Sequence, residues 1–572
     1  MGVGPRTPYR LEASEAARDI PPPADYAPGM GAVAEDRVAR QARWVAAAAF
    51  LLLLPGAFFG LPNKPMAGAW RVLQGEVIYR DFWTIYAPGS YYAGAGLCAL
   101  FGKHVLVPAV VGVALRAVAV GCFFAVLREL GGGRRLAVWL SLLVTLALWE
   151  ITPELGTYCG VLAPGMGAVL LAVLFLGGGR PRRLLWAGLL LGLGATFKHD
   201  VAAYLTLAIA VAVLVSGRPW PERRAAVVRL GVGSAAVVGP VIALLAWKAG
   251  ADAWQDLIVF PLGDFRIVRA ERFPGLVPDL KFVRAWMAEP GNLTHARDAG
   301  VQASRWFLTR GPELAFAGAV VFLIRRRGTL PRETRAAAVL ALCAMPCFWT
   351  AAHVQQNTHL LSMAIQSLLL GTIVWTRAPA WRRYCGLVLA MLVAGMLVKP
   401  VQQVWLPLRV WSGWATLDLP PTVGVFVSPR EAQYYGRIKQ FIDDNVPPGE
   451  AIHAGVAHND SIVVNNSRFY YLMDRPAATR YHELHPGITD REPVQREMIA
   501  DLERRNVRCI VSWRFGQSPA AAAAVIARRA AEIPDAGSTL LDEWVAERFE
   551  KVFSVDEYDV LWRRDAGEPV VR

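Results

Sequence analysis

The segment GLLLGLGATFKHDVAAYLTLA (188–208) consists of two apolar runs joined by a charged corner, Phe197-Lys198-His199-Asp200. Similar apolar runs recur up to residue 398, and several approach the roughly 20 residues that cross a bilayer as a helix. The composition agrees, because 54% of the 572 residues are hydrophobic and only 19% are charged. The sequence therefore predicts a polytopic α-helical membrane protein. The eleven expected spans lie near 44–61, 105–127, 136–152, 159–177, 184–197, 201–216, 226–247, 307–324, 336–350, 358–375 and 384–398.

Basic clusters between these spans predict the orientation of the chain, because short cytoplasmic loops of membrane proteins are enriched in Lys and Arg. With the N-terminus in the cytoplasm, every cluster falls on the cytoplasmic side, provided that 90–101 does not cross. We expect that segment, which is too short to span, to be a helix lying along the outer surface. The clusters lie at 35–44, 128–135, 177–183, 217–224, 325–335 and 376–383.

The chain after residue 399 is polar and is expected on the extracytoplasmic side. Residues 428–446 are typical of a helix, with Ser428 as the N-cap and Glu431 three residues later. Apolar strand patterns at 451–456 and 508–513 flank an amphipathic helix at 493–506, which together predict a small α/β domain. The predicted divisions are a disordered cytoplasmic tail (1–40), a transmembrane domain (41–400) with outer loops 62–104 and 248–306, a linker (401–427) and the extracytoplasmic α/β domain (428–572).

The net charge of +14 does not indicate a nucleic-acid partner. Residues 428–572 carry 19 Lys and Arg and 23 Asp and Glu, so the positive excess lies in the short loops of the membrane part. The expected surroundings are the lipid bilayer, with no nucleic acid.

Two carboxylates are expected on the outer face. Asp81, in GEVIYRDFWTIYAPGSYY (75–92), is a candidate general base for an acceptor hydroxyl or amine. The alternative for Asp81 is a structural ion pair with Arg80. Glu154, in the turn TPELGTY (152–158), is the second candidate, and its alternative role is to cap that turn.

Four cationic or titratable side chains share that face. Lys198 and His199 can bind a lipid phosphate as charge-assisted donors, or they snorkel to the interface. His359 begins a span and can contact the same phosphate, while Arg266 can guide an anionic headgroup. For these two, the alternatives are an interfacial histidine and a solvated basic face.

Aromatic residues surround Asp81. Tyr79, Trp83 and Tyr86 can stack on a substrate, or they belong to the aromatic belt at the membrane interface.

Motifs for resident cofactors are missing from the sequence. There is no phosphate-binding Gly-rich loop ending in Lys-Ser/Thr, no zinc helix of the His-Glu-x-x-His type, and no cysteine pair with metal-ligand spacing and His partners. No metal ligands are predicted. A divalent cation held by carboxylates stays open as an alternative to Lys and His for neutralising a phosphate.

Several of these segments together resemble a known enzyme group. A first span is followed by QGEVIYRDF (74–82) and then by APGSYY (87–92). This order resembles the first outer loop of bacterial GT-C membrane glycosyltransferases, which include protein O-mannosyltransferase-like and aminoarabinose-transferase-like enzymes. Residues 188–208 resemble their lysine-bearing middle segment, and HLLSMAIQSLLL (359–370) resembles their His-led span. Residues 465–487 look like their extracytoplasmic tail.

The resemblance implies a GT-C-like fold in the bacterial cytoplasmic (inner) membrane. Such enzymes move a sugar from a polyprenyl-phosphate carrier to an extracytoplasmic acceptor, with inversion by single displacement. It implies that Asp81 acts as base or orients the acceptor, and that Lys198 with His199 binds the carrier phosphate. Arg80 is a further candidate for binding the donor phosphate. Many relatives carry a carboxylate directly after the first span, where this chain has Leu61-Pro62-Asn63-Lys64-Pro65.

Two other functions fit the same sequence. A flippase or transporter of a lipid-linked glycan would place ionisable residues near mid-membrane, and only Arg116 lies at the centre of a predicted span. A non-catalytic envelope scaffold would fit the missing carboxylate near Asn63.

Overall fold

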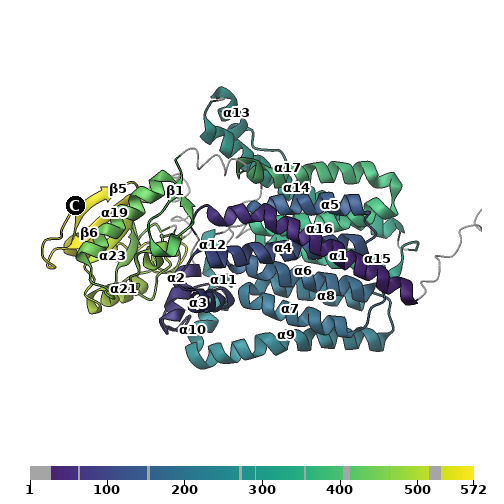
Figure 1. The fold of residues 1–572 in the computed structure, drawn as a ribbon, viewed down its shortest axis with the longest axis horizontal. Coiled ribbons are helices and arrows are strands. Elements are labelled where there is room, and N and C mark those ends of the chain that lie inside the picture. Colours follow the sequence, from purple (N-terminus) through teal and green to yellow (C-terminus); the bar gives the residue numbers. More distant parts are fainter. Residues whose placement is uncertain are drawn as a thin grey trace, which may run out of the picture.

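All eleven predicted spans fall on helices in the computed structural model, which describes residues 28–61, 65–150, 155–269, 274–289, 291–326, 328–352, 356–403, 413–462, 464–514 and 530–571. These helices run side by side as one bundle, and the C-terminal domain lies at one end of it (Figure 1). They are α1 (Pro28–Leu53), α4 (Leu106–Glu129), α5 (Arg134–Ala147), α6 (Thr157–Leu176), α7 (Arg182–Phe197), α8 (His199–Leu214), α9 (Trp220–Ala249), α14 (Leu293–Arg326), α15 (Arg332–Ala352), α16 (Gln356–Arg377) and α17 (Arg382–Gln403).

Eight of the described helices are long and apolar enough to cross a membrane. This confirms a polytopic membrane protein. Helices α5, α7 and α8 have 14, 16 and 16 residues. At about 1.5 Å per residue they are shorter than the roughly 30 Å apolar core of a bilayer. The number of eleven spans and their orientation therefore stay predictions.

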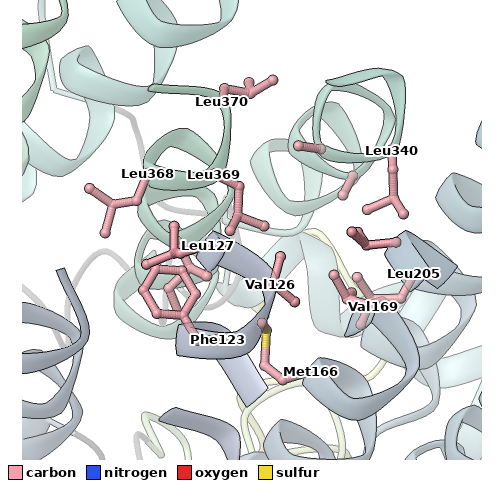
Figure 2. Close-up of a cluster of buried hydrophobic side chains, with 14 of the residues drawn as sticks. Phe123, Val126, Leu127, Met166, Val169, Leu205, Leu340, Leu368, Leu369 and Leu370 are labelled. Carbon is pink, nitrogen blue, oxygen red and sulfur yellow. The ribbon is translucent and has the colours of Figure 1, made fainter. Parts of the chain in front are cut away.

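A buried hydrophobic cluster packs α4, α6, α8, α15 and α16 together (Figure 2). In lipid, close packing of side chains rather than exclusion of water sets the positions of neighbouring helices. The cluster therefore fixes α8, the helix that begins after Lys198, against α6 and α15. The labelled members are Phe123, Val126, Leu127, Met166, Val169, Leu205, Leu340, Leu368, Leu369 and Leu370.

The C-terminal part forms the predicted α/β domain around a four-stranded sheet of order β3-β4-β6-β5. Strands β3 and β4 are parallel and the other pairs are antiparallel. The predicted capping box is confirmed, because the Glu431 N–H donates to Ser428 Oγ at 3.2 Å and the Ser428 N–H donates to Glu431 Oε2 at 3.1 Å. The main elements are α19 (Pro429–Asn445), β3 (His453–Val456), α20 (Arg468–Met473), α21 (Glu492–Arg504), β4 (Cys509–Trp513), α23 (Leu540–Arg548), β5 (Phe549–Val555) and β6 (Tyr558–Arg563).

Short helices connect the bundle to this domain at the same end of the molecule (Figure 1). The guanidinium of Arg71 donates to the carbonyl oxygens of Thr479, at 2.9 Å, and Asp81, at 3.0 Å. The backbone N–H of Trp83 donates to the Arg480 carbonyl at 2.9 Å. The first predicted outer loop and the C-terminal domain are thus one packed unit. The short elements are α2 (Pro65–Leu73), α3 (Gly89–Phe101), α10 (Ala251–Trp254), a π-helical turn (Gln255–Val259), α11 (Phe260–Leu262) and α12 (Asp264–Arg269). A further short helix, α13 (Lys281–Ala288), packs against α14.

Two predicted boundaries differ from the structure. Helix α1 begins at Pro28, so residues 28–40 are helical and do not belong to a disordered tail. This stretch is rich in Ala and Arg, and an ion pair between Asp36 and Arg40 one turn apart supports a helix. The predicted linker 401–427 also contains structure, since β1 (Ala415–Thr416) pairs antiparallel with β2 (Phe426–Val427).

Candidate functional site

A cleft of about 350 Å³ lies where α7 meets α8, at the end of the bundle that carries the C-terminal domain. Its lining is mixed. Apolar side chains come in part from the segment that follows α9, with Leu257, Pro261 and Phe265. The titratable side chains that line the cleft are Lys198, His199, Asp200, Arg266 and His359, together with the hydroxyls of Tyr86 and Tyr204.

Lys198 lies at the break between α7 and α8. Its backbone is extended, with φ −151° and ψ 94°, so the two helices meet at a corner and do not continue as one. The Lys198 ammonium lies 3.2 Å from Asp200 Oδ2 and 4.7 Å from the centre of the Tyr158 ring. A buried ammonium needs such partners, because burial away from water is costly for an unpaired charge. The side chain of Lys198 is only 11% exposed.

His359 enters the cleft from the start of α16. Its Nε2 is 3.7 Å from the same Asp200 oxygen that contacts Lys198. The rings of Tyr158 and Phe348 pack around its imidazole, with ring centres about 6 Å away. His359 Nδ1 and His199 Nδ1 are both buried, and neither has a hydrogen-bond partner in the described part of the chain. The His359 imidazole and the Lys198 ammonium therefore converge on a single carboxylate.

Two glycines, Gly89 and Gly160, lie directly against the residues that precede Lys198 and hold this corner in place. A Cβ on Gly89, which begins α3, would meet the Thr196 carbonyl oxygen at 2.6 Å. A Cβ on Gly160 in α6 would meet the Phe197 ring at 2.1 Å. Glycine is thus required where the first outer loop and α6 press against the residues that precede Lys198.

The predicted base Asp81 does not line the cleft. Its carboxylate pairs with Arg80 at 2.8 Å and accepts a hydrogen bond from the Val77 N–H at 2.7 Å. The Arg80 guanidinium is the main cause that lowers the pKa of Asp81 below its usual range. The structure therefore places Asp81 and Arg80 together in a turn beside the C-terminal domain. Glu154, the other predicted carboxylate, lies outside the described residues.

Of the three predicted stacking residues, only Tyr86 reaches the cleft. Tyr79 is fully buried and donates its hydroxyl hydrogen to the Tyr86 carbonyl at 2.8 Å. Trp83 is 2% exposed and packs against Phe260, with ring centres 5.6 Å apart. The structure therefore places Tyr79 and Trp83 in the packing of the outer loop.

The sequence interpretation left out three residues of this region. Asp200 and Tyr158 contact Lys198, and the position of Asp200 two residues after Lys198 could have indicated the pair. Asp256, in the π-helical turn, is 6% exposed, and burial raises its pKa to about 7. Nothing in its local sequence distinguishes it from a surface aspartate.

The described residues contain no group of three or more His, Cys, Asp or Glu side chains that could hold a metal ion. All seven cysteines are free thiols.

No protein-family model and no curated protein matches the chain. Among solved structures, it is similar to ArnT from Cupriavidus metallidurans bound to undecaprenyl phosphate, with 14% identity and a TM-score of 0.42 over 93% of this chain and 99% of that protein. The apo state of that protein gives 13% identity and a TM-score of 0.43 over 92% of this chain and 98% of that one. The arabinofuranosyltransferase AftD from Mycobacteria gives 13% identity and a TM-score of 0.46 over 92% of this chain and 40% of AftD. Because every TM-score is below 0.5, the roles of the cleft residues rest on their own geometry.

Proposed function

We propose that this protein is a membrane glycosyltransferase that moves a sugar from a polyprenyl-phosphate carrier to an extracytoplasmic lipid, glycan or protein acceptor. The convergence of Lys198, His199 and His359 on one apolar-walled cleft carries the proposal. It agrees with the resemblance of residues 74–92 and 188–208 to GT-C glycosyltransferases.

The chemistry of the donor fits the mixed lining of the cleft. A polyprenyl phosphate joins a long apolar chain to an anionic headgroup. Apolar side chains of the segment from Leu257 to Phe265 suit the isoprenoid next to the phosphate. Lys198 and Arg266 suit the phosphate oxygens, since charge-assisted hydrogen bonds are the stronger class.

These cations also serve the reaction itself. When the glycosidic C–O bond to the carrier breaks, the bonding electrons go to the phosphate oxygen, and its negative charge increases. Positive groups already placed at that oxygen stabilise the transition state. Lys198 is held in place by Asp200, so we assign Asp200 to positioning and Lys198 to phosphate binding.

The acceptor needs a base, and sequence supplies two candidates. Asp81 is already paired with Arg80 and lies outside the cleft lining, which speaks against direct contact with the acceptor. We therefore favour Glu154, which precedes Leu155 and the cleft residue Thr157 in the chain. A single displacement by the acceptor oxygen inverts the anomeric centre.

The test is sugar transfer by purified full-length protein in nanodiscs. Radiolabelled polyprenyl-phosphate sugars are supplied with an envelope acceptor fraction, and wild type is compared with the isosteric variants Asp81→Asn and Glu154→Gln. We expect wild type and Asp81→Asn to transfer label and Glu154→Gln to lose at least about 100-fold, as for a missing general base. Repeating the assay in EDTA checks that Lys and His suffice without a divalent cation.

Two results would contradict the proposed function, and a third would change the assigned base. The absence of transfer from any donor would favour a non-catalytic scaffold. Movement of the intact lipid-linked glycan between leaflets, without sugar transfer, would favour a flippase. A large loss in Asp81→Asn alone would return the base to Asp81.

A further inference from the structure

A second pocket, of about 390 Å³, lies within the C-terminal domain and does not share a lining residue with the cleft at Lys198. Its size falls in the range of about 300 to 1,000 Å³ that small-molecule sites occupy. It is formed where the start of α19, the segment 464–468, the end of β4 and the turn between β5 and β6 come together.

Aromatic rings form one wall of this pocket. The Trp513 ring stacks on Tyr558, with ring centres 5.9 Å apart and planes 21° apart. Tyr434 packs against Tyr558 at 4.9 Å. Tyr434 and Tyr558 are at most 7% exposed, whereas Trp513 is only half-buried. The indole of Trp513 therefore gives the pocket a rigid, flat and partly accessible apolar surface.

Polar groups face this wall. Asn466 donates to the hydroxyls of Tyr435, at 2.9 Å, and Tyr558, at 2.8 Å, which fixes the amide and the aromatic wall relative to each other. The neighbouring Ser467 is 1% exposed, and its buried Oγ has no hydrogen-bond partner within the described ranges. A buried hydroxyl without a partner is costly, and a ligand hydroxyl in the pocket would satisfy it.

The charges in the lining disfavour an anionic ligand. Arg430 is already paired with Asp556 at 2.5 Å and with Glu557 at 2.7 Å. Glu431 and Arg468 are the remaining charged residues of the lining, so carboxylates outnumber guanidiniums by three to two. A phosphate or carboxylate ligand would enter an environment with a net negative charge.

We propose that this pocket binds a neutral glycan. A sugar ring has an apolar face of C–H groups, which suits the Trp513 ring, and a rim of hydroxyls, which suits carboxylates, amides and the Ser467 hydroxyl. The inference does not depend on transferase activity, because it concerns binding in a different part of the chain.

The experiment measures binding in the absence of any sugar donor. Fluorophore-labelled probes are titrated into full-length protein in nanodiscs. The neutral probes are tetrasaccharides of mannose, galactose, glucose and arabinofuranose. A tetrasaccharide of glucuronic acid represents acidic glycans, and Ala-Glu-Lys-Ala-Ala represents peptides. Fluorescence anisotropy gives each Kd. We expect at least one neutral tetrasaccharide to bind and the Trp513→Leu variant to weaken it about tenfold or more, the loss typical of a stacking ring.

Trp544→Leu is the matched control. Trp544 is a half-buried tryptophan of the same domain whose indole N–H also donates to a glutamate, Glu503, at 3.1 Å. Trp513 donates to Glu557 at 3.0 Å. We expect Trp544→Leu to leave the Kd unchanged.

Hydroxyl-radical footprinting of the wild type gives a second readout that does not depend on folding of a variant. Bound tetrasaccharide should protect Trp513 from oxidation and leave Trp544 unprotected. The proposal is overturned if no neutral glycan binds, if the glucuronic acid probe or the peptide binds instead, or if glycan binding protects Trp544 and not Trp513.

Discussion

Lys198 and Asp200 form an ion pair of 3.2 Å across the break between α7 and α8, with both side chains in the cleft. His359 approaches the same Asp200 oxygen at 3.7 Å from α16, a helix far along the chain. The carboxylate thus sets the positions of a cation and an imidazole that come from separate helices. This arrangement is the basis of the proposed phosphate site.

Asp200→Asn should therefore impair donor binding more than turnover. Without the carboxylate charge, the Lys198 ammonium loses its anchor and is less well placed for the carrier phosphate. We expect the KM for the lipid-linked donor to rise about tenfold, with a smaller change in kcat. Asp200→Glu should recover part of the loss. The exposed Asp252, changed to Asn, is the control, and a fall in kcat at constant KM would contradict the positioning role.

Gly89→Ala should displace the corner at Lys198, although Gly89 itself belongs to α3. The new Cβ would lie 2.6 Å from the Thr196 carbonyl oxygen, a backbone atom that cannot rotate away. The start of α3 or the end of α7 must then shift, and we expect transfer activity to fall at least about tenfold, since small displacements at a site are costly. Gly96→Ala in the same helix meets nothing within 4 Å and should keep activity and thermal stability. Equal behaviour of the two variants would show that the contact does not matter.

Arg71 should be the main stabilising contact between the first outer loop and the C-terminal domain. Arg71 is 3% exposed, and its guanidinium pairs with Glu76 at 2.6 Å and donates to two carbonyls, including that of Thr479. We expect Arg71→Met to cost about 3 kcal/mol, seen as a lower apparent Tm, because buried acceptors lose their donor. Arg80→Met removes a half-exposed guanidinium nearby and should lower the apparent Tm much less, because exposed ion pairs contribute little to stability. Equal shifts for both variants would argue against this docking role.

Asp256 predicts a specific dependence of stability on pH. Burial raises the pKa of its carboxyl from 3.8 to about 7, so between these values the folded protein retains a proton that the unfolded chain has lost. The free energy of unfolding then falls as pH rises from about 4 to about 7, because ionising the buried carboxyl is costly. Above pH 7 this loss stays constant, at no more than about 4 kcal/mol. Asp256→Asn removes this penalty. Its Tm advantage over wild type should be larger at pH 8 than at pH 4.5.

Asp418→Asn, at an exposed position between β1 and β2, should give the same Tm difference from wild type at both pH values. A Tm advantage of Asp256→Asn that does not grow with pH would show that the Asp256 carboxyl is not held protonated by the fold.

Sequence predicted the features that depend on local pattern. The Ser428 capping box and the strands at 451–456 and 508–513 follow from local residue order, and the structure contains them. The Lys198 corner was likewise visible as charge between two apolar runs. The α/β fold of the C-terminal domain and the charged corner at Lys198 could therefore be predicted from sequence.

The remaining features depend on contacts between distant segments. The Arg71 donor to Thr479 joins residues 408 positions apart, and no local pattern indicates it. Tyr79 and Trp83 are typical of an interfacial aromatic belt, yet Tyr79 is buried in a cluster with residues of α9 and α10, and Trp83 packs against Tyr481 of the C-terminal domain. The burial of Asp256 likewise comes from its three-dimensional neighbours. Tertiary packing decides which polar and aromatic side chains of a loop remain accessible.

The most direct test of the account is the affinity of the cleft for a lipid phosphate. Radiolabelled undecaprenyl phosphate is titrated into full-length protein in nanodiscs, for wild type, Lys198→Ala and Lys248→Ala. Lys248 is an exposed lysine in the last turn of α9 and lies outside the cleft lining. We predict saturable binding by wild type. Lys198→Ala should weaken it about tenfold or more, as expected for the loss of one charge-assisted contact, and Lys248→Ala should leave it unchanged. Equal affinity of Lys198→Ala and wild type would contradict the phosphate site.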